Sequence, residues 1–291
     1  SDITFSDNPN QTGLNDWYET YSRGFVHGTT DGVPNFKPIT NANLLVYNGA
    51  SETKAYRIVN LTEQVSADAG LFEVLGKGQT IKNVVLTGTK VEAGSGKAAG
   101  ALVGRINGDA VIEHCQVFLT SADIQGKSNR DVWISGSTAG GLIGVITGGT
   151  VKITGSAAST VVGAHTFNGA TSEVTAFRSA SVGGLVGSIT GGTSAIEESY
   201  ADCYLVGETA GGLAGKSTGT VTLTSSYAAG FATYQTEGAG LICGSAAMKN
   251  CYTVIHKINL SGATLPYYAT AKGGSATGKV YYAAGNVNIA D

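Results

Sequence analysis

Proline and charge are both scarce in this sequence. Only 4 of the 291 residues are proline, and 13% are charged, which is about half the share of roughly 25% in soluble domains. The net charge is −3 and no run of basic residues occurs, so the attraction that dominates nucleic-acid binding is missing. The apolar runs fall far short of the roughly 18 residues of a membrane span. We therefore expect no nucleic-acid partner and no membrane span in this chain.

Cysteine and histidine are equally sparse. The four cysteines are Cys115, Cys203, Cys243 and Cys251. No Cys-x-x-Cys pair occurs, so we interpret them as buried free thiols that act as small apolar residues, with a Cys243–Cys251 bridge as the alternative. The four histidines are His27, His114, His165 and His256. None pairs at i, i+4 and His-Glu-x-x-His is absent, so the sequence predicts no metal site and no cofactor.

Glycine is abundant, at 43 residues, about twice its average share of roughly 7%. Much of it flanks a leucine in a block that recurs along the chain. The marker leucines are Leu71, Leu102, Leu142, Leu185, Leu213 and Leu241. After each leucine comes a glycine turn and a β-rich run such as 220–224 (Thr-Val-Thr-Leu-Thr), whose period of two is typical of a half-buried strand.

A repeat of about 28 residues with two or three short strands cannot bury its own apolar face, but stacked repeats can. The sequence therefore predicts an all-β fold, a parallel β-helix of about six to eight coils over residues 55–291. Residues 1–54 lack the repeat, and we interpret them as an N-terminal cap with one short helix near 15–21. Its apolar contacts would be Trp17, Tyr18, Tyr21 and Phe25, with an aromatic glycan platform as the alternative.

The repeat resembles the GLUG motif, a Gly-Gly-Leu-Val-Gly block followed by Gly-Thr-Val-x-Asn-Ser-Tyr-Ala-x-Gly. Residues 183–187 with 199–201, and 211–215 with 226–230, match it closely. The resemblance covers about residues 55–255. It implies a right-handed parallel β-helix in a bacterial surface protein, since such repeats occur in adhesin-like proteins and in non-catalytic portions of immunoglobulin-A-specific metallopeptidases. We therefore expect an extracellular, cell-surface location, with any signal or anchor outside this chain.

Catalytic groups are hard to find. Glycosidases need two carboxylates on one site, yet the only adjacent acidic pair is Glu197-Glu198, whose side chains would point to opposite faces of a strand. We predict no catalytic residue. A carbohydrate-active β-helix enzyme remains the alternative, together with a purely structural stalk.

Extra length in two repeats points to a binding site. The leucine spacings of 40 and 43 residues exceed the 28-residue unit by 12 and 15, and insertions in solenoids often line the binding side. We place the insertions at the same point of consecutive coils, where aromatic residues would stack as a strip. The candidate ligand-binding residues are Arg130, Asp131, Trp133, His165, Phe167, Phe177, Arg178 and Tyr204.

The sequence thus predicts a non-enzymatic, monomeric adhesin module that binds a glycan or a host or bacterial surface protein. The alternative interpretation of the aromatic residues is that they cover the solenoid's own flank.

The absence of a ligand cluster generates the first prediction. Protein purified without chelator should contain no stoichiometric metal, and EDTA should leave its melting temperature unchanged, because no His, Cys or acidic residues have suitable spacing. Elemental analysis and paired melts measure this. A stoichiometric metal whose removal lowers the melting temperature would contradict it.

Overall fold

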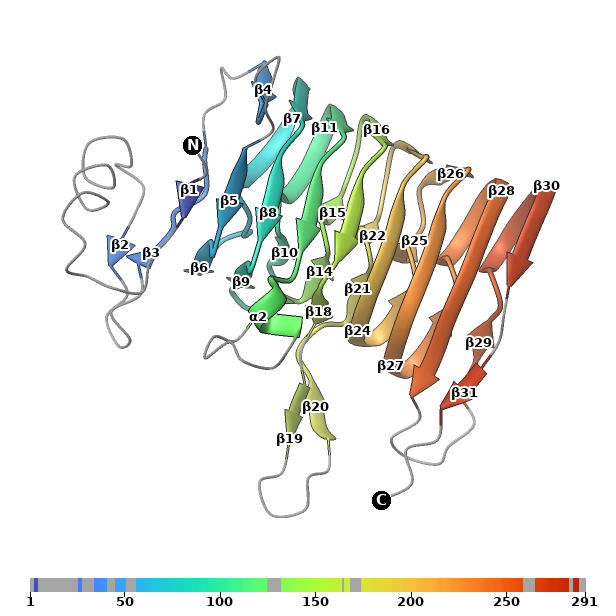
Figure 1. Ribbon diagram of the computed structural model, residues 1–291. Helices are drawn as coiled ribbons and strands as arrows, with labels where there is room; N and C mark the ends of the chain where they lie inside the picture. Colours follow the sequence, from blue (N-terminus) through green and yellow to red (C-terminus); the bar gives the residue numbers. More distant parts are fainter. Residues whose placement is uncertain are drawn as a thin grey trace.

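Short parallel strands, stacked in register from one end of the molecule to the other, form almost the whole structure (Figure 1). The computed structural model describes residues 3–4, 26–27, 34–40, 45–50, 56–124, 132–163, 165–167, 174–258, 265–282 and 285–287. One helix, α2 (Ser121–Ile124), occurs among them. The predicted all-β class with parallel, solenoid-like strand stacking is therefore confirmed.

The strands of the large sheet fall into five columns, in each of which a strand pairs in parallel with the equivalent strand of the next repeat. Six long strands turn corners and contribute to more than one column: β7 (Phe72–Lys82), β11 (Val103–Glu113), β24 (Tyr200–Gly211), β27 (Tyr227–Ala239), β28 (Ile242–Ile258) and β30 (Ala271–Tyr282). The first column, directly after the leucines, adds β15 (Ile143–Ile146), β22 (Val186–Ile189) and β25 (Ala214–Ser217). The second adds β4 (Val46–Asn48), β16 (Thr150–Thr154), β23 (Thr193–Glu197) and β26 (Thr220–Thr224).

The other three columns follow the next corner. The third adds β1 (Ile3–Thr4), β5 (Arg57–Val59), β8 (Val85–Thr87), β12 (Gln116–Phe118) and β17 (Ala157–Ser159). The fourth adds β6 (Thr62–Val65), β9 (Lys90–Ala93), β13 (Ile134–Ser135), β18 (Val161–Gly163) and β31 (Gly285–Val287). The fifth adds β10 (Ala98–Gly100), β14 (Thr138–Gly140), β21 (Ser181–Gly183) and β29 (Tyr267–Tyr268).

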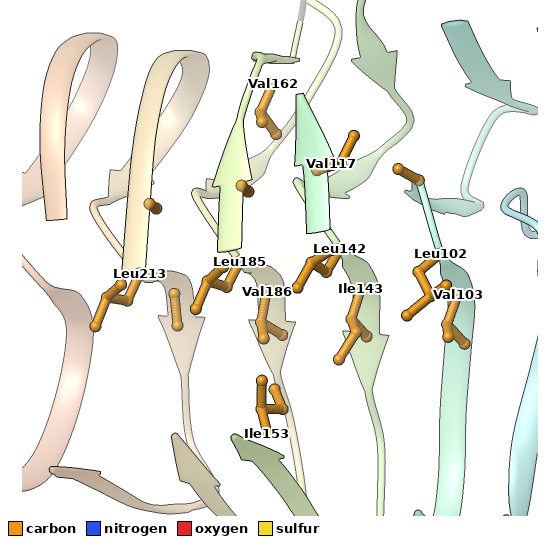
Figure 2. Packing of buried hydrophobic residues seen from close by; sticks show 14 of the residues in the cluster. Leu102, Val103, Val117, Leu142, Ile143, Ile153, Val162, Leu185, Val186 and Leu213 are labelled. Carbon is orange, nitrogen blue, oxygen red and sulfur yellow. The ribbon is translucent and has the colours of Figure 1, made fainter. Parts of the chain in front are cut away.

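The marker leucines form a ladder through the core (Figure 2). All six are at most 3% exposed. Their backbones are also joined, since the N–H of Leu142 donates to the carbonyl of Leu185 at 3.0 Å and the N–H of Leu185 donates to that of Leu213 at 2.8 Å. Each buried leucine contributes about 1.5–3 kcal/mol, and the repeat places one in every coil.

The corner between the second and third columns is built in the left-handed region of backbone space. Six equivalent residues have φ between 49° and 57°: Asn83, His114, Gly155, Glu198, Ser225 and Asn250. The N–H of each of the first five donates to a carbonyl of the following coil, for example from Glu198 to Thr224 at 3.0 Å. Glycine takes this conformation freely and asparagine tolerates it, whereas glutamate and serine are strained there.

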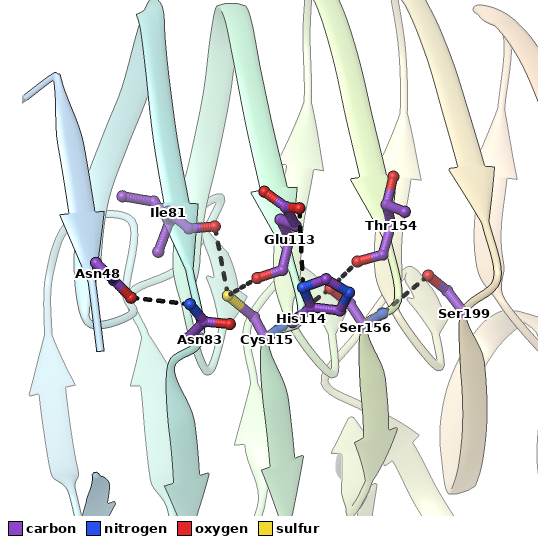
Figure 3. Close-up of polar contacts among 9 residues, drawn as sticks. All are labelled: Asn48, Ile81, Asn83, Glu113, His114, Cys115, Thr154, Ser156 and Ser199. Carbon is purple, nitrogen blue, oxygen red and sulfur yellow. Dashed lines mark hydrogen bonds and ion pairs between the residues drawn. The ribbon is translucent and has the colours of Figure 1, made fainter. Parts of the chain in front are cut away.

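A hydrogen-bonded column of serine and cysteine lies just inside this corner (Figure 3). The N–H of Cys115 donates to Ser156 Oγ at 3.1 Å, and the N–H of Ser156 donates to Ser199 Oγ at 3.1 Å. Each serine hydroxyl in turn donates to a carbonyl two residues earlier, as Ser199 does to Glu197 at 2.7 Å. All four cysteines are free and buried, which confirms their interpretation as thiols in the core and excludes the Cys243–Cys251 bridge.

Part of the N-terminal segment pairs with the stack. β1 pairs in parallel with β5, β4 pairs with β7, and Ile39 forms a parallel bridge with Phe72. Phe36 is 6% exposed and belongs to the core. β2 (Val26–His27) and β3 (Pro34–Asn35) form a separate antiparallel pair. The helix predicted near 15–21, with the aromatic contacts Trp17, Tyr18, Tyr21 and Phe25, lies outside the described residues.

The strained corner generates the second prediction. Replacing Glu198 by glycine should stabilise the protein by about 1 kcal/mol, because relief of a strain of about 1–2 kcal/mol outweighs the added freedom of the unfolded chain. The free energy of unfolding from urea titration measures this.

A matched control separates the relief of backbone strain from the general effect of introducing a glycine. Thr222→Gly changes an exposed residue of β26, where no strain exists to be relieved, and should destabilise the protein by about 0.5–1 kcal/mol. If Glu198→Gly destabilises the protein as much as the control, the corner is not strained.

Candidate functional site

Trp133 lies on the outer surface at the start of the fourth column. The next residue, Ile134, is fully buried and pairs with Val91 of the preceding coil. Because side chains alternate along a strand, Trp133 faces outward beside Lys90, whose Nζ lies 4.9 Å from the centre of the indole ring. A cation over an aromatic face contributes about 0.5–1 kcal/mol at an exposed site, so the indole is held in place.

The carboxylate of Glu92 joins side chains from other coils. Its Oε1 accepts a hydrogen bond from Trp133 Nε1 at 2.9 Å and forms an ion pair with Arg178 Nη1 at 3.2 Å. Its Oε2 accepts a hydrogen bond from Gln64 Nε2. Positions 64 and 178 are far apart in the sequence, yet the stacking brings them to one carboxylate. We call Gln64, Lys90, Glu92, Trp133 and Arg178 the Glu92 cluster.

The electrostatics of the cluster keep Glu92 ionised. The side chain is 12% exposed, and this burial by itself raises the pKa of the carboxyl. The hydrogen bonds from Gln64 and Trp133, together with the charges of Lys90 and Arg178, outweigh burial and lower the pKa below its usual value. The carboxylate therefore holds the indole and the guanidinium in fixed positions at neutral pH.

A hollow of about 200 Å³ lies next to the cluster. Its lining consists of Ala93, Gly94, Ser95, Ser135, Gly136, Ser137 and Arg178. The hydroxyl of Ser137 accepts a hydrogen bond from the N–H of Gly96 at 2.7 Å. The buried hydroxyl of Ser135 has no hydrogen-bond partner among the described residues. The side chain of Arg178 is 47% exposed, so the hollow offers hydroxyls and a guanidinium to a small polar group.

Aromatic side chains cover the outer surface of the third and fourth columns towards the C-terminal end. We call this surface the aromatic face, and it consists of Tyr200, Tyr204, Tyr227, Phe231, Tyr252 and His256. The rings of Tyr200 and Tyr227 stack with centroids 4.9 Å apart and planes 2° from parallel. Tyr227, Phe231 and Tyr252 are 40%, 42% and 44% exposed. Exposed aromatic side chains that gather on one surface in this way form a candidate interaction site.

The sequence-predicted candidates divide between these places. Trp133 and Arg178 meet at Glu92, and Tyr204 belongs to the aromatic face. His165 and Phe167 lie in β19 (His165–Phe167), and Phe177 ends β20 (Val174–Phe177). These two strands form an antiparallel hairpin that projects from the stack beside β18 and β21 (Figure 1). Arg130 and Asp131 lie outside the described residues.

The two insertions are not at the same point of the repeat, and that part of the sequence interpretation is wrong. The first, which contains α2, precedes β13, whereas the second, which contains the hairpin, follows β18. β13 and β18 are equivalent strands, because Ile134 pairs with Val162. Val161, and not Phe177, therefore stands beside Trp133. The spacing between leucines shows how many residues are inserted into a coil, but it does not show at which corner of the coil the insertion lies.

Sequence reasoning missed Glu92 and most of the aromatic face. The tyrosines had a usable signal, since Tyr200 and Tyr227 each follow a serine of the repeated block, and equal positions in successive coils must stack. Glu92 had no such signal in the sequence, because it belongs to a segment that the other coils do not repeat.

One buried carboxyl has an unusual environment but no access to a substrate. Glu63, in β6, is 0% exposed, and neither oxygen forms a hydrogen bond with a described group. Burial raises its pKa well above the usual range. The Gly70 amide is near enough to oppose this in part, while the charge of Glu73 adds to it. A raised carboxyl pKa is common in catalytic acids, but a group without exposed surface cannot meet a ligand.

The described residues contain no group of side chains suited to a metal ion. No three side chains of His, Cys, Asp or Glu in this part of the chain come together in a way that could hold one.

The helix of the described residues, α2, has four residues and is far too short to cross a membrane.

Known proteins offer little guidance on function. No protein-family profile and no curated protein matches this chain. Among solved structures, it is similar to a crystal structure described as a "putative immunoglobulin A1 protease from Bacteroides ovatus", with 15% identity and a TM-score of 0.41, over 78% of this chain and 72% of that one. A likeness this distant leaves the function to be inferred from the chain's own residues.

The lowered pKa of Glu92 generates the third prediction. Glu92→Gln should destabilise the protein at pH 7, since the ionised carboxylate is stabilised by four neighbours in the folded state. For a carboxyl with a lowered folded pKa, this stabilisation is complete above the unfolded value of about 4.3 and is lost as the pH falls through the folded value. Unfolding free energies of the two proteins should therefore converge only once the pH has fallen below the lowered folded pKa of Glu92. A difference that does not change with pH would show that the charge is irrelevant.

Proposed function

We propose that this protein is a non-catalytic module of a bacterial cell surface that binds glycans outside the cell. The Glu92 cluster is the observation that carries the proposal. In it, Trp133 and Arg178, from two different insertions, are held by one carboxylate beside a polar hollow. An indole ring offers apolar area at low entropic cost, and a guanidinium adds directional hydrogen bonds. Together they suit the alternating apolar and hydroxyl surfaces of a sugar.

The scaffold supports binding because it is rigid at the site. Glu92 lies in β9, which pairs with β6 on one side and β13 on the other. Trp133 directly precedes β13, and its carbonyl accepts a hydrogen bond from the N–H of Val91 at 2.9 Å. A preorganised site loses little side-chain entropy on binding. The proposal includes a right-handed coil, which is the hand that parallel strand crossovers adopt in about 98% of cases and the one that the GLUG resemblance implies.

Absence of catalysis belongs to the proposal as well. Among the described residues, the carboxyl whose pKa is raised well above its usual range is Glu63, and it is fully buried. Glu92 is held ionised by its partners, so it serves as an anchor for Trp133 and Arg178. Adhesion at a cell surface needs a firm contact and no turnover, which fits a site of this kind.

The fourth prediction tests the function. On a glycan array, the protein should bind at least one saccharide, and Trp133→Ala and Arg178→Gln should each weaken that binding by about 1–2 kcal/mol, or about 5- to 30-fold in Kd. Thr222→Ala, on a different column, should bind like the parent protein. Melting temperatures of all variants show whether each is folded.

The outcomes separate the functions. Binding that survives both substitutions would place the ligand elsewhere. Failure to bind any glycan, together with binding to a host matrix protein, would favour a protein adhesin. Turnover of a polysaccharide would overturn the non-catalytic assignment.

A further inference from the structure

We propose that the ligand is an extended, unbranched glycan that lies along the axis of the stack, over the aromatic face, with about one sugar unit per coil. This inference rests on the proposed function and specifies the ligand. Trp133 and Arg178 would hold one end of the chain, and the aromatic face would hold the rest.

Strand register connects the two surfaces. Five residues occupy the same outward position in successive coils: Trp133, Val161, Tyr204, Phe231 and His256. The first is placed by the pairing of its neighbour Ile134 with Val162, and the others are paired directly. The cluster and the aromatic face are therefore two ends of one row on the same surface.

A second row runs beside the first. Tyr200, Tyr227 and Tyr252 are paired in register and lie four residues before Tyr204, Phe231 and His256 on the same strands. Four residues of a strand span about 13 Å. The positions midway between the rows carry Asp202, Ala229 and Val254, all of which have smaller side chains than the rings on either side. The surface thus offers two parallel rows of rings that follow the axis.

The spacing of the rows suits a repeating polymer. Successive coils are separated by the strand spacing of about 4.8 Å, which is close to the length that one pyranose unit adds to an extended chain. The four steps from Trp133 to His256 then cover about 19 Å. A ligand with a similar repeat can make the same contact at each coil, whereas the surface of a globular partner does not repeat in this way.

The chemistry of the rings also favours a hydroxyl-rich chain. Because Tyr200 and Tyr227 stack face to face, they present their edges and hydroxyls to solvent. A phenol can donate and accept a hydrogen bond, as a sugar hydroxyl can. Phe231 and His256 are tilted by 35° with centroids 5.6 Å apart, which leaves part of a ring face open for the apolar side of a sugar.

A second copy of this chain would repeat as well, but the apolar area is too small. Three rings at 40–44% exposure offer on the order of 250 Å² if a ring side chain carries about 200 Å². A stable protein interface buries about 800 Å² on each partner. Asp202 is also exposed within the face, where two copies would bring like charges together.

Oligosaccharides of defined length provide the test. The probes are cello-, xylo-, chito- and galacturono-oligosaccharides from the disaccharide to the octasaccharide, measured by calorimetry with the intact protein. For the series that binds, affinity should rise with each unit up to about the pentasaccharide, which spans the five coils from Trp133 to His256, and then level off.

Substitutions on the aromatic face should act on long ligands alone. Phe231→Ala and Tyr252→Ala should each weaken hexasaccharide binding about 5- to 30-fold and leave disaccharide binding unchanged, whereas Trp133→Ala should weaken both. Tyr252→Phe keeps the ring and loses the hydroxyl, so an intermediate loss would assign part of the binding to the hydroxyl. Thr222→Ala is the control, and melting temperatures identify any variant that fails to fold.

Each other outcome overturns the inference. Equal affinity for all lengths, with binding still dependent on Trp133, would leave the proposed function standing and refute the axial ligand. Failure of every probe to bind would refute both. If Phe231→Ala instead shifts the sedimentation of the protein, the aromatic face is an interface between copies.

Discussion

Parallel hydrogen bonding between the backbones of successive coils is the interaction on which the rest of this structure depends. Each strand forms backbone hydrogen bonds with the equivalent strand of the next repeat, about 4.8 Å away. The bonds from Leu142 to Leu185 and from Leu185 to Leu213 are examples. Register is fixed because a slip of one residue would turn every buried side chain outward. Once the register is fixed, residues at equal positions must lie in columns, whatever their chemistry.

The columns explain why non-glycine residues are found at the left-handed corner and why small polar side chains are found just inside it. A corner in the left-handed region recurs in six coils because the coil must bend there, and glycine occupies just one of the six positions. The strain at Glu198 and Ser225 is offset by the N–H groups that each coil donates to the next. The column inside that corner holds three successive serines, with Cys115 before them and Cys251 after them, since either side chain can approach a backbone carbonyl while remaining small enough for the core.

The same stacking produces the candidate site. Gln64, Glu92 and Arg178 come from different coils, and a carboxylate shared among them is stable because hydrogen bonds and two cations outweigh the cost of its burial. The outward row from Trp133 to His256 arises from register alone. A scaffold of this kind converts a short sequence repeat into a long periodic surface, which is the property that an extended ligand requires.

The sequence by itself determined the all-β class, the unit of about 28 residues, the leucine ladder and the free cysteines, because these follow from local periodicity and from how often a pattern recurs. It also singled out Trp133 and Arg178 as neighbours of a site. Tertiary structure alone decided that Glu92 joins them, that the two insertions leave opposite ends of one strand column, and that Tyr227, Phe231 and Tyr252 share a surface. The physical reason is register. A spacing between leucines gives the length of a coil, but the hydrogen bonds between strands decide which residue of one coil faces which residue of the next.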